Sequence, residues 1–171
     1  DYSQVELRIL AHMSGDESLI QAFLHKEDIH RRTAAEVLGI PFEDVTPEQR
    51  SHAKAVNFGI IYGISDFGLS RQLGIPRKQA ADYIKAYFER YPHIHDFMNG
   101  LIEKARDTGR ATTLFGRYRE LPDIHSKNFQ RRSFAERTAM NTPIQGTAAD
   151  IIKIAMIHVS NRLQEECPSA K

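Results

Sequence analysis

The stretch Thr46-Pro-Glu-Gln-Arg-Ser-His-Ala-Lys-Ala-Val-Asn-Phe-Gly-Ile-Ile-Tyr-Gly63 starts and stops like a helix. Thr46 can accept a hydrogen bond from the backbone of Gln49, whose side chain can bond back to Thr46. Pro47 suits the first helical position, because the N–H that it lacks would have no partner there. Gly63 can adopt the left-handed conformation that ends many helices. These signals predict a helix over residues 47–62.

One face of this helix combines positive charge with aromatic rings. Its side chains recur every four residues and therefore lie in one stripe: Arg50, Lys54, Phe58 and Tyr62. Two cations one turn apart repel each other, so the pair suits binding to several phosphates better than it suits helix stability. The rings offer flat surfaces to a base or a sugar, and Gly59 and Gly63 would let another group approach the backbone closely. The alternative is a solvated face whose aromatic residues belong to the core.

The composition is that of an ordinary globular domain. The 171 residues are 41% hydrophobic and 26% charged, which is enough for one hydrophobic core. The single cysteine, Cys167, excludes an internal disulfide and a cysteine zinc site. The chain begins without Met and has no apolar run that could cross a bilayer, so we expect an interior piece of an intracellular, non-membrane protein.

Charge is distributed unevenly along the chain. Residues 1–49 carry 4 basic and 10 acidic side chains, a net charge of −6, whereas residues 50–171 carry 19 and 12, a net charge of +7. An acidic first part suits metal binding, and a basic remainder suits contact with phosphates.

The rest of the sequence predicts a mainly α (α+β) fold. A brief alternation over residues 1–8 predicts an opening strand, which passes into a helical pattern over residues 7–13 that ends near Gly15. Two short segments, 111–115 and 118–121, flank Gly116 and Arg117 and predict a hairpin. Capping residues and apolar periodicity predict helices over 16–25, 28–38, 65–73, 76–90, 93–107, 129–141 and 151–166, the last with its apolar side chains in the core.

Two motifs resemble those of family A DNA polymerases of the bacterial DNA polymerase I type. Arg-x3-Lys-x3-Phe-Gly-x2-Tyr-Gly, residues 50–63, resembles motif B, the fingers helix. The first eight residues, Asp-Tyr-Ser-Gln-Val-Glu-Leu-Arg, resemble motif A, and the resemblance continues through residues 141–150 to cover essentially the whole chain. It implies a palm fragment at 1–15, a fingers subdomain at 16–125 that includes helix 47–62, and helices returning to the palm at 126–171.

The resemblance also implies an activity. It is template-directed DNA synthesis, in which a primer 3′-OH attacks a deoxynucleoside triphosphate. The expected partners are primer–template DNA and deoxynucleoside triphosphates, and the expected protein is a monomer in the bacterial cytoplasm, associated with the nucleoid. A non-enzymatic, mostly helical DNA-binding module is the alternative.

For catalysis, the resemblance implies that Asp1 holds two Mg2+ ions together with the backbone carbonyl of Tyr2, and that Arg50 and Lys54 assist. The family's second metal-binding carboxylate lies in a Val-His-Asp-Glu segment that this sequence lacks. We therefore expect the fragment alone to be inactive.

For the incoming nucleotide, the resemblance implies that Glu6 excludes a ribose 2′-OH and that Tyr62 holds Glu6 in place. His30, Arg50 and Lys54 would contact the phosphates. Phe58 would pack near the base, and as Phe rather than Tyr it is the version associated with rejecting dideoxynucleotides. The complete implied set is Gln4, Glu6, His30, Arg50, Lys54, Phe58 and Tyr62.

For DNA, the resemblance implies backbone contacts from Arg117 and Arg119 at the hairpin, where Tyr118 replaces a commoner Arg. Arg137, Asn141 and Gln145 fall four residues apart on one helix face and would contact the primer–template duplex. Arg137 and Gln145 would do so in the minor groove, where contacts tolerate any sequence.

Overall fold

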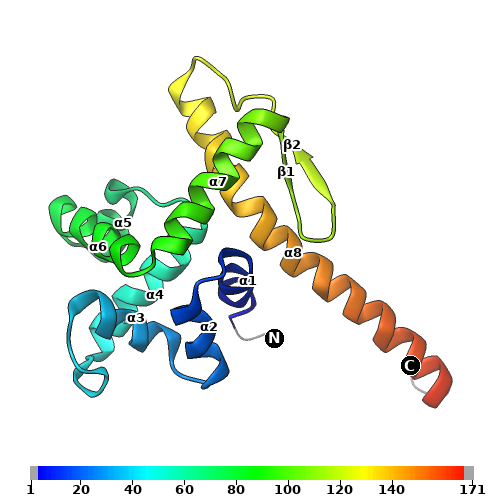
Figure 1. Ribbon diagram of the computed structural model, residues 1–171, viewed down its shortest axis with the longest axis horizontal. Helices are drawn as coiled ribbons and strands as arrows, with labels where there is room; N and C mark the ends of the chain where they lie inside the picture. The colour runs from blue at the N-terminus through cyan, green and yellow to red at the C-terminus, as the bar shows by residue number, and fades with distance from the viewer. Residues whose placement is uncertain (1–3, 168–171) are drawn as a thin grey trace.

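The computed structural model describes residues 4–167, and within them the predicted mainly helical fold is confirmed (Figure 1). None of the helices in this range is long and apolar enough to span a membrane. The helices are α1 Val5–Ser14, α2 Glu17–Leu24, α3 Ile29–Leu38, the short 3-10 turn η1 Phe42–Asp44, α4 Pro47–Ile61, α5 Asp66–Leu73, α6 Arg77–Arg90, α7 Pro92–Thr108 and α8 Phe129–Glu166. The strands β1 Arg110–Thr112 and β2 Tyr118–Glu120 form an antiparallel hairpin.

Helix α4 begins and ends as its sequence predicts. Thr46 Oγ1 accepts from the backbone N–H of Gln49 at 3.2 Å, and Gln49 Oε1 accepts from the N–H of Thr46 at 2.9 Å, which completes the capping box. At the other end the N–H of Ile64 donates to the carbonyl of Gly59 at 2.8 Å, and Gly63 has a φ of +64°. These features form a Schellman motif and fix the direction in which the chain leaves the helix.

The main core lies where α1, α4, α6, α7 and α8 meet. Its fully buried side chains include Leu7, Leu10, Ile61, Ile94 and Ile144. A smaller cluster, which includes Ala111, Leu121 and Ala139, packs the hairpin between α7 and α8. Because α4 packs against α1, α3 and α8, side chains from three distant parts of the sequence can meet along it.

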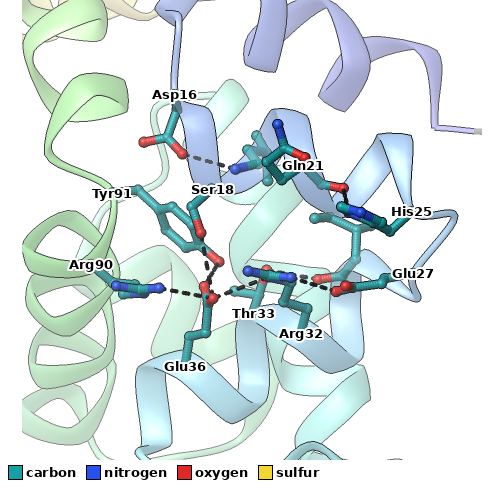
Figure 2. Close-up of polar contacts among 12 residues, drawn as sticks. Asp16, Ser18, Gln21, His25, Glu27, Arg32, Thr33, Glu36, Arg90 and Tyr91 are labelled. Atoms are coloured by element: carbon teal, nitrogen blue, oxygen red, sulfur yellow. Dashed lines mark hydrogen bonds and ion pairs between the residues drawn. The ribbon is translucent and has the colours of Figure 1, made fainter.

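A polar cluster fixes α3 against α2, α6 and the start of α7, and Figure 2 shows Glu36 at its centre. The carboxylate of Glu36 accepts from Arg32 Nε at 3.1 Å, from Arg90 Nη2 at 3.0 Å and from Tyr91 Oη at 2.5 Å. Burial would raise the pKa of Glu36, but the hydrogen bonds from Arg90 and Tyr91 and the charge of Arg32 hold it below its ordinary value. The cluster therefore anchors the helix whose first residues reach the stripe on α4.

The prediction of an opening strand is wrong for its described part. Val5 and Glu6 already belong to α1, as do Leu7 and Arg8 in the predicted helical pattern, whereas residues 1–3 lie outside the described range. Leu7 and Leu10 are fully buried three residues apart, so helical packing against the core decides the conformation of this short, ambiguous segment.

The predicted break in the last helix is also absent, because α8 is continuous for 38 residues through Pro143. Pro143 is buried and directly precedes Ile144, a fully buried residue of the main core, and this burial offsets the hydrogen bond that proline removes. Beyond the core α8 extends away from the other helices (Figure 1), and no described residue covers its apolar side chains there. The prediction that these side chains are core residues is therefore wrong for Ile152, Ile154, Met156, Ile157, Val159 and Leu163, which are exposed.

Candidate functional site

The stripe on α4 faces solvent along its charged part. Lys54 is exposed and makes no ion pair with any residue from 4 to 167. Arg50 is half-exposed, and its Nε donates to Asp28 Oδ2 at 2.7 Å. Within the described chain Arg50 makes no other hydrogen bond, so both of its terminal nitrogens remain available to a ligand such as phosphate.

Asp28 has two functions at the start of α3. Its Oδ1 caps the helix by accepting the backbone N–H groups of His30 and Arg31, each at 3.1 Å, and its Oδ2 binds Arg50. Burial would raise the pKa of Asp28, but the hydrogen bonds from Arg50 and Arg31 and the charge of Arg50 keep it below its ordinary value. The sequence indicated the cap but gave no sign of the ion pair.

His30 lies beside the stripe and is only 3% exposed. Its ring centroid is 5.8 Å from that of Phe58. Burial and the positive charges of Arg50 and Lys54 lower the pKa of His30 to about 4, although Asp28 acts in the opposite direction. At neutral pH the imidazole is therefore uncharged and can donate one hydrogen bond.

Three polar side chains meet at the other end of the stripe. Tyr62 Oη donates to Glu6 Oε2 at 3.2 Å and accepts from Gln145 Nε2 at 2.8 Å. Burial and the neighbouring charge of Glu6 raise the pKa of Tyr62, so the phenol keeps the proton that it donates. The predicted contact between Tyr62 and Glu6 is confirmed, and Gln145 joins it from α8. Gln4 lies just before α1 in a left-handed conformation, with a φ of +56°.

A groove of about 410 Å³ borders the aromatic part of the stripe, between α4, α5 and the N-terminal half of α8. Phe58, Tyr62 and Arg137 line it together. The sequence predicted that Gly59 and Gly63 let another group approach the backbone closely, and the groups that do so are side chains of this chain, Ile64 and Met140. A Cβ on Gly59 would lie 2.7 Å from Ile64 Cγ2, and one on Gly63 would overlap Met140.

The predicted DNA contacts separate into two groups. Arg137, Asn141 and Gln145 lie on one face of α8, and the exposed Arg137 donates only to Ser133 Oγ, at 2.8 Å, within the described chain. At the hairpin, Arg119 is exposed, whereas Arg117 binds Asp150 Oδ1 at 2.8 Å and the carbonyl of Gly146 at 3.0 Å. Arg117 therefore joins the hairpin to α8 and has fewer donors left for DNA.

The metal prediction is not tested by this arrangement. Asp1 and Tyr2 lie outside the described residues, and residues 4–167 contain no group of three or more His, Cys, Asp or Glu side chains that could hold a metal ion. The carboxylate of Glu6 accepts a hydrogen bond from Tyr62.

Known proteins resemble this chain over nearly its full length. DNA polymerase I of Caldicellulosiruptor bescii is 59% identical over 165 residues, which cover 96% of this chain and 19% of that protein. DNA polymerase I of Lactococcus lactis subsp. cremoris is 58% identical over 172 residues, which cover 100% of this chain and 20% of that protein. The chain thus spans about one fifth of the length of these curated relatives.

A solved structure shares the fold. The POL domain of Pol1 from M. smegmatis, in complex with DNA primer-template and dNTP, superposes with a TM-score of 0.92 at 44% identity, over 96% of this chain and 29% of that one. The family model of DNA polymerase family A matches residues 1–171. With residues 5–8 of one family-like motif on α1, with the other motif along α4, and with this fold around them, the chain belongs to DNA polymerase family A.

Proposed function

We propose that this chain is the nucleotide-binding part of a polymerase that transfers a deoxynucleotide from its triphosphate to a primer 3′-OH, as directed by a DNA template. The observation that carries the proposal is that phosphate-binding side chains and the hydrogen-bonded Tyr62 lie along the same helix, α4. Arg50, Lys54 and His30 supply phosphate ligands at one end of the stripe, and Tyr62 binds Glu6 and Gln145 at the other. The related Pol1 domain was solved with primer-template DNA and dNTP, which supports the same use here.

Different residues of this chain would contact the phosphates, the sugar and the DNA, according to the chemistry of their side chains. Arg50 presents two free terminal nitrogens, Lys54 adds a mobile charge, and neutral His30 adds a directional donor for phosphate oxygens. Glu6, held by Tyr62, would lie against the sugar and exclude a 2′-OH. Arg119, Arg137, Asn141 and Gln145 would contact DNA without reading its sequence.

Magnesium is part of the proposal, with Asp1 and the carbonyl of Tyr2 as its ligands in this chain. Bound Mg2+ would stabilise the negative charge that develops on the phosphate oxygens. The second metal-binding carboxylate of the proposal belongs to the Val-His-Asp-Glu segment that this sequence lacks, so the fragment alone should not extend primers.

The same proposal extends to the organisation and setting of the protein. The chain would divide into a palm part at 1–15, a fingers part at 16–125 and returning helices at 126–171. The whole protein would be a monomer in the cytoplasm. The shared core of α1, α4 and α8 supports close association of these three parts rather than independent folding.

A chimera tests the proposal. Residues 1–171 would replace the matching segment of the Lactococcus lactis polymerase, which is 58% identical over 172 residues. Primer extension would be measured for the chimera, for Arg50→Ala and for the control Arg77→Ala, whose arginine pairs with Asp66 on an exposed surface of α5 and α6. Losing a charged hydrogen bond to phosphate costs about 1.5–3 kcal/mol, so Arg50→Ala should raise the KM for dNTP about 10- to 100-fold.

The control variant should behave like the unmodified chimera, and DNA affinity should be unchanged in both. A DNA-binding module would give the opposite pattern, since Arg50→Ala would weaken DNA binding with no dependence on nucleotide. That result, or a chimera that folds and binds DNA but cannot extend a primer, would refute the proposal.

A further inference from the structure

A chain of buried polar side chains lies behind His30. Asn57, on α4, and Thr33, on α3, are fully buried, and neither belongs to the stripe. Asn57 Nδ2 lies 3.1 Å from His30 Nδ1 and 3.0 Å from Thr33 Oγ1. A buried amide is costly unless it is hydrogen-bonded, so these contacts must be mutually compatible.

With Asn57 Nδ2 turned toward both His30 and Thr33, as in this structure, the available hydrogens define the direction of each bond. Thr33 Oγ1 has one hydrogen, and its shortest acceptor is the carbonyl of Ile29 at 2.8 Å, compared with 3.3 Å to Asn57 Oδ1. Thr33 Oγ1 therefore accepts from Asn57 Nδ2. The second hydrogen of that amide points to His30 Nδ1, which must then be an acceptor without a proton.

We propose that Asn57 is a positioning residue, whose buried amide fixes His30 as the Nε2–H tautomer, so that the ring offers one N–H donor and no positive charge to a triphosphate oxygen. This inference rests on the proposed function for the identity of the ligand. The opposite ring nitrogen is suited to the task, because Nε2 makes no hydrogen bond within residues 4–167 and is not one of the fully buried, unpartnered polar atoms found there.

Two of the three surrounding charges also favour the neutral imidazole. Arg50 and Lys54 on α4 disfavour a charged imidazole, and Asp28 at the start of α3 is the acidic group that favours it. A proton on Nδ1 would also set two N–H groups against each other at the Asn57 contact. The two stripe cations therefore supply the charge that attracts phosphate, and His30 supplies one N–H donor in a fixed orientation.

Nuclear magnetic resonance can determine the tautomer directly. In the 15N-labelled 171-residue chain, the side-chain nitrogens of His30 would be assigned with His30→Gln and recorded from about pH 6 to about pH 8. We expect the Nε2–H tautomer throughout this range, and a change in the Nε2 shift when inorganic tripolyphosphate or dATP is added. An Nδ1–H tautomer or an imidazolium in the unmodified chain would overturn the proposal without any further variant.

Substitutions then separate positioning from simple loss of packing. Asn57→Asp keeps the shape of the side chain but replaces the donor with an acceptor, which should move the proton to Nδ1 and raise the pKa of His30. Val56→Ala removes a fully buried neighbour of Asn57 and should lower stability while leaving the tautomer unchanged. Thr33→Val removes the acceptor that orients the amide, and should give a mixture of tautomers.

Kinetics in the chimera separate this inference from the proposed function. For Asn57→Asp we expect the KM for dNTP to rise at least about fivefold between pH 6 and pH 8, compared with little change in the parent chimera, because the imidazolium loses its proton over this interval. Equal pH profiles in a folded variant would overturn the inference while polymerase activity of the parent chimera still supported the proposed function. A correct tautomer in an inactive chimera would instead refute the proposed function alone.

Discussion

Gly59→Ala and Gly100→Ala should change stability in opposite directions, although both glycines lie inside helices with φ values outside the left-handed region. Alanine stabilises a helix interior by about 0.5–1 kcal/mol relative to glycine. A Cβ on Gly100 would meet nothing within 4 Å, so Gly100→Ala should gain this amount. A Cβ on Gly59 would lie 2.7 Å from Ile64 Cγ2 and 3.2 Å from Ile64 Cβ and Cδ1.

Ile64 has little freedom to move away. Its N–H is bonded to the carbonyl of Gly59 at 2.8 Å, its side chain is branched at Cβ, and it packs against the main core. Overpacking of this kind costs about 1–3 kcal/mol, which exceeds the helical gain. We therefore expect Gly59→Ala to be less stable than Gly100→Ala by about 1–3 kcal/mol.

Urea unfolding of the two variants and the parent chain, followed by circular dichroism, measures this difference. With a slope of about 1–3 kcal/mol per M, the two midpoints should differ by about 1 M, on opposite sides of the parent. If Gly59→Ala is as stable as Gly100→Ala, the close packing at the end of α4 is not what requires glycine there, and the reasoning is refuted.

Two further substitutions test the polar contacts around α3 and α4. Glu36→Gln should cost about 2 kcal/mol at pH 7, because it removes the charge from three hydrogen bonds. Since the pKa of Glu36 is lowered in the folded state, its contribution is complete above the ordinary pKa and is lost as the pH falls through the folded value. Urea midpoints of parent and variant should therefore converge on acidification, and a constant difference would contradict the assignment. Tyr62→Phe should leave stability nearly unchanged, because the side chain is 43% exposed, but should free Glu6 and lower the preference for dATP over ATP about fivefold, equivalent to about 1 kcal/mol. Competing incorporation in the chimera measures this preference, and an unchanged ratio would show that Glu6 does not need Tyr62.

Local features of the sequence predicted most of the helices. Asp28 and Gly39, for example, mark both ends of α3, and each acts through bonds to backbone groups within a few residues. Predictions failed where local signals were weak or were offset by packing. The segment 4–8 is too short for its sequence pattern to distinguish a strand from a helix. In α8, Pro143 is itself buried, and this burial keeps the helix continuous.

The sequence alone determined the limits of α4 and the stripe of cations and rings on it, because capping and the helical repeat depend only on nearby residues. The tertiary structure decided which partners those side chains meet. Tyr62 binds Glu6 across 56 positions of sequence and Gln145 across 83, and Asn57 contacts His30 across 27. Such pairs form because core packing brings α1, α3, α4 and α8 together, and no local rule specifies the register in which helices pack.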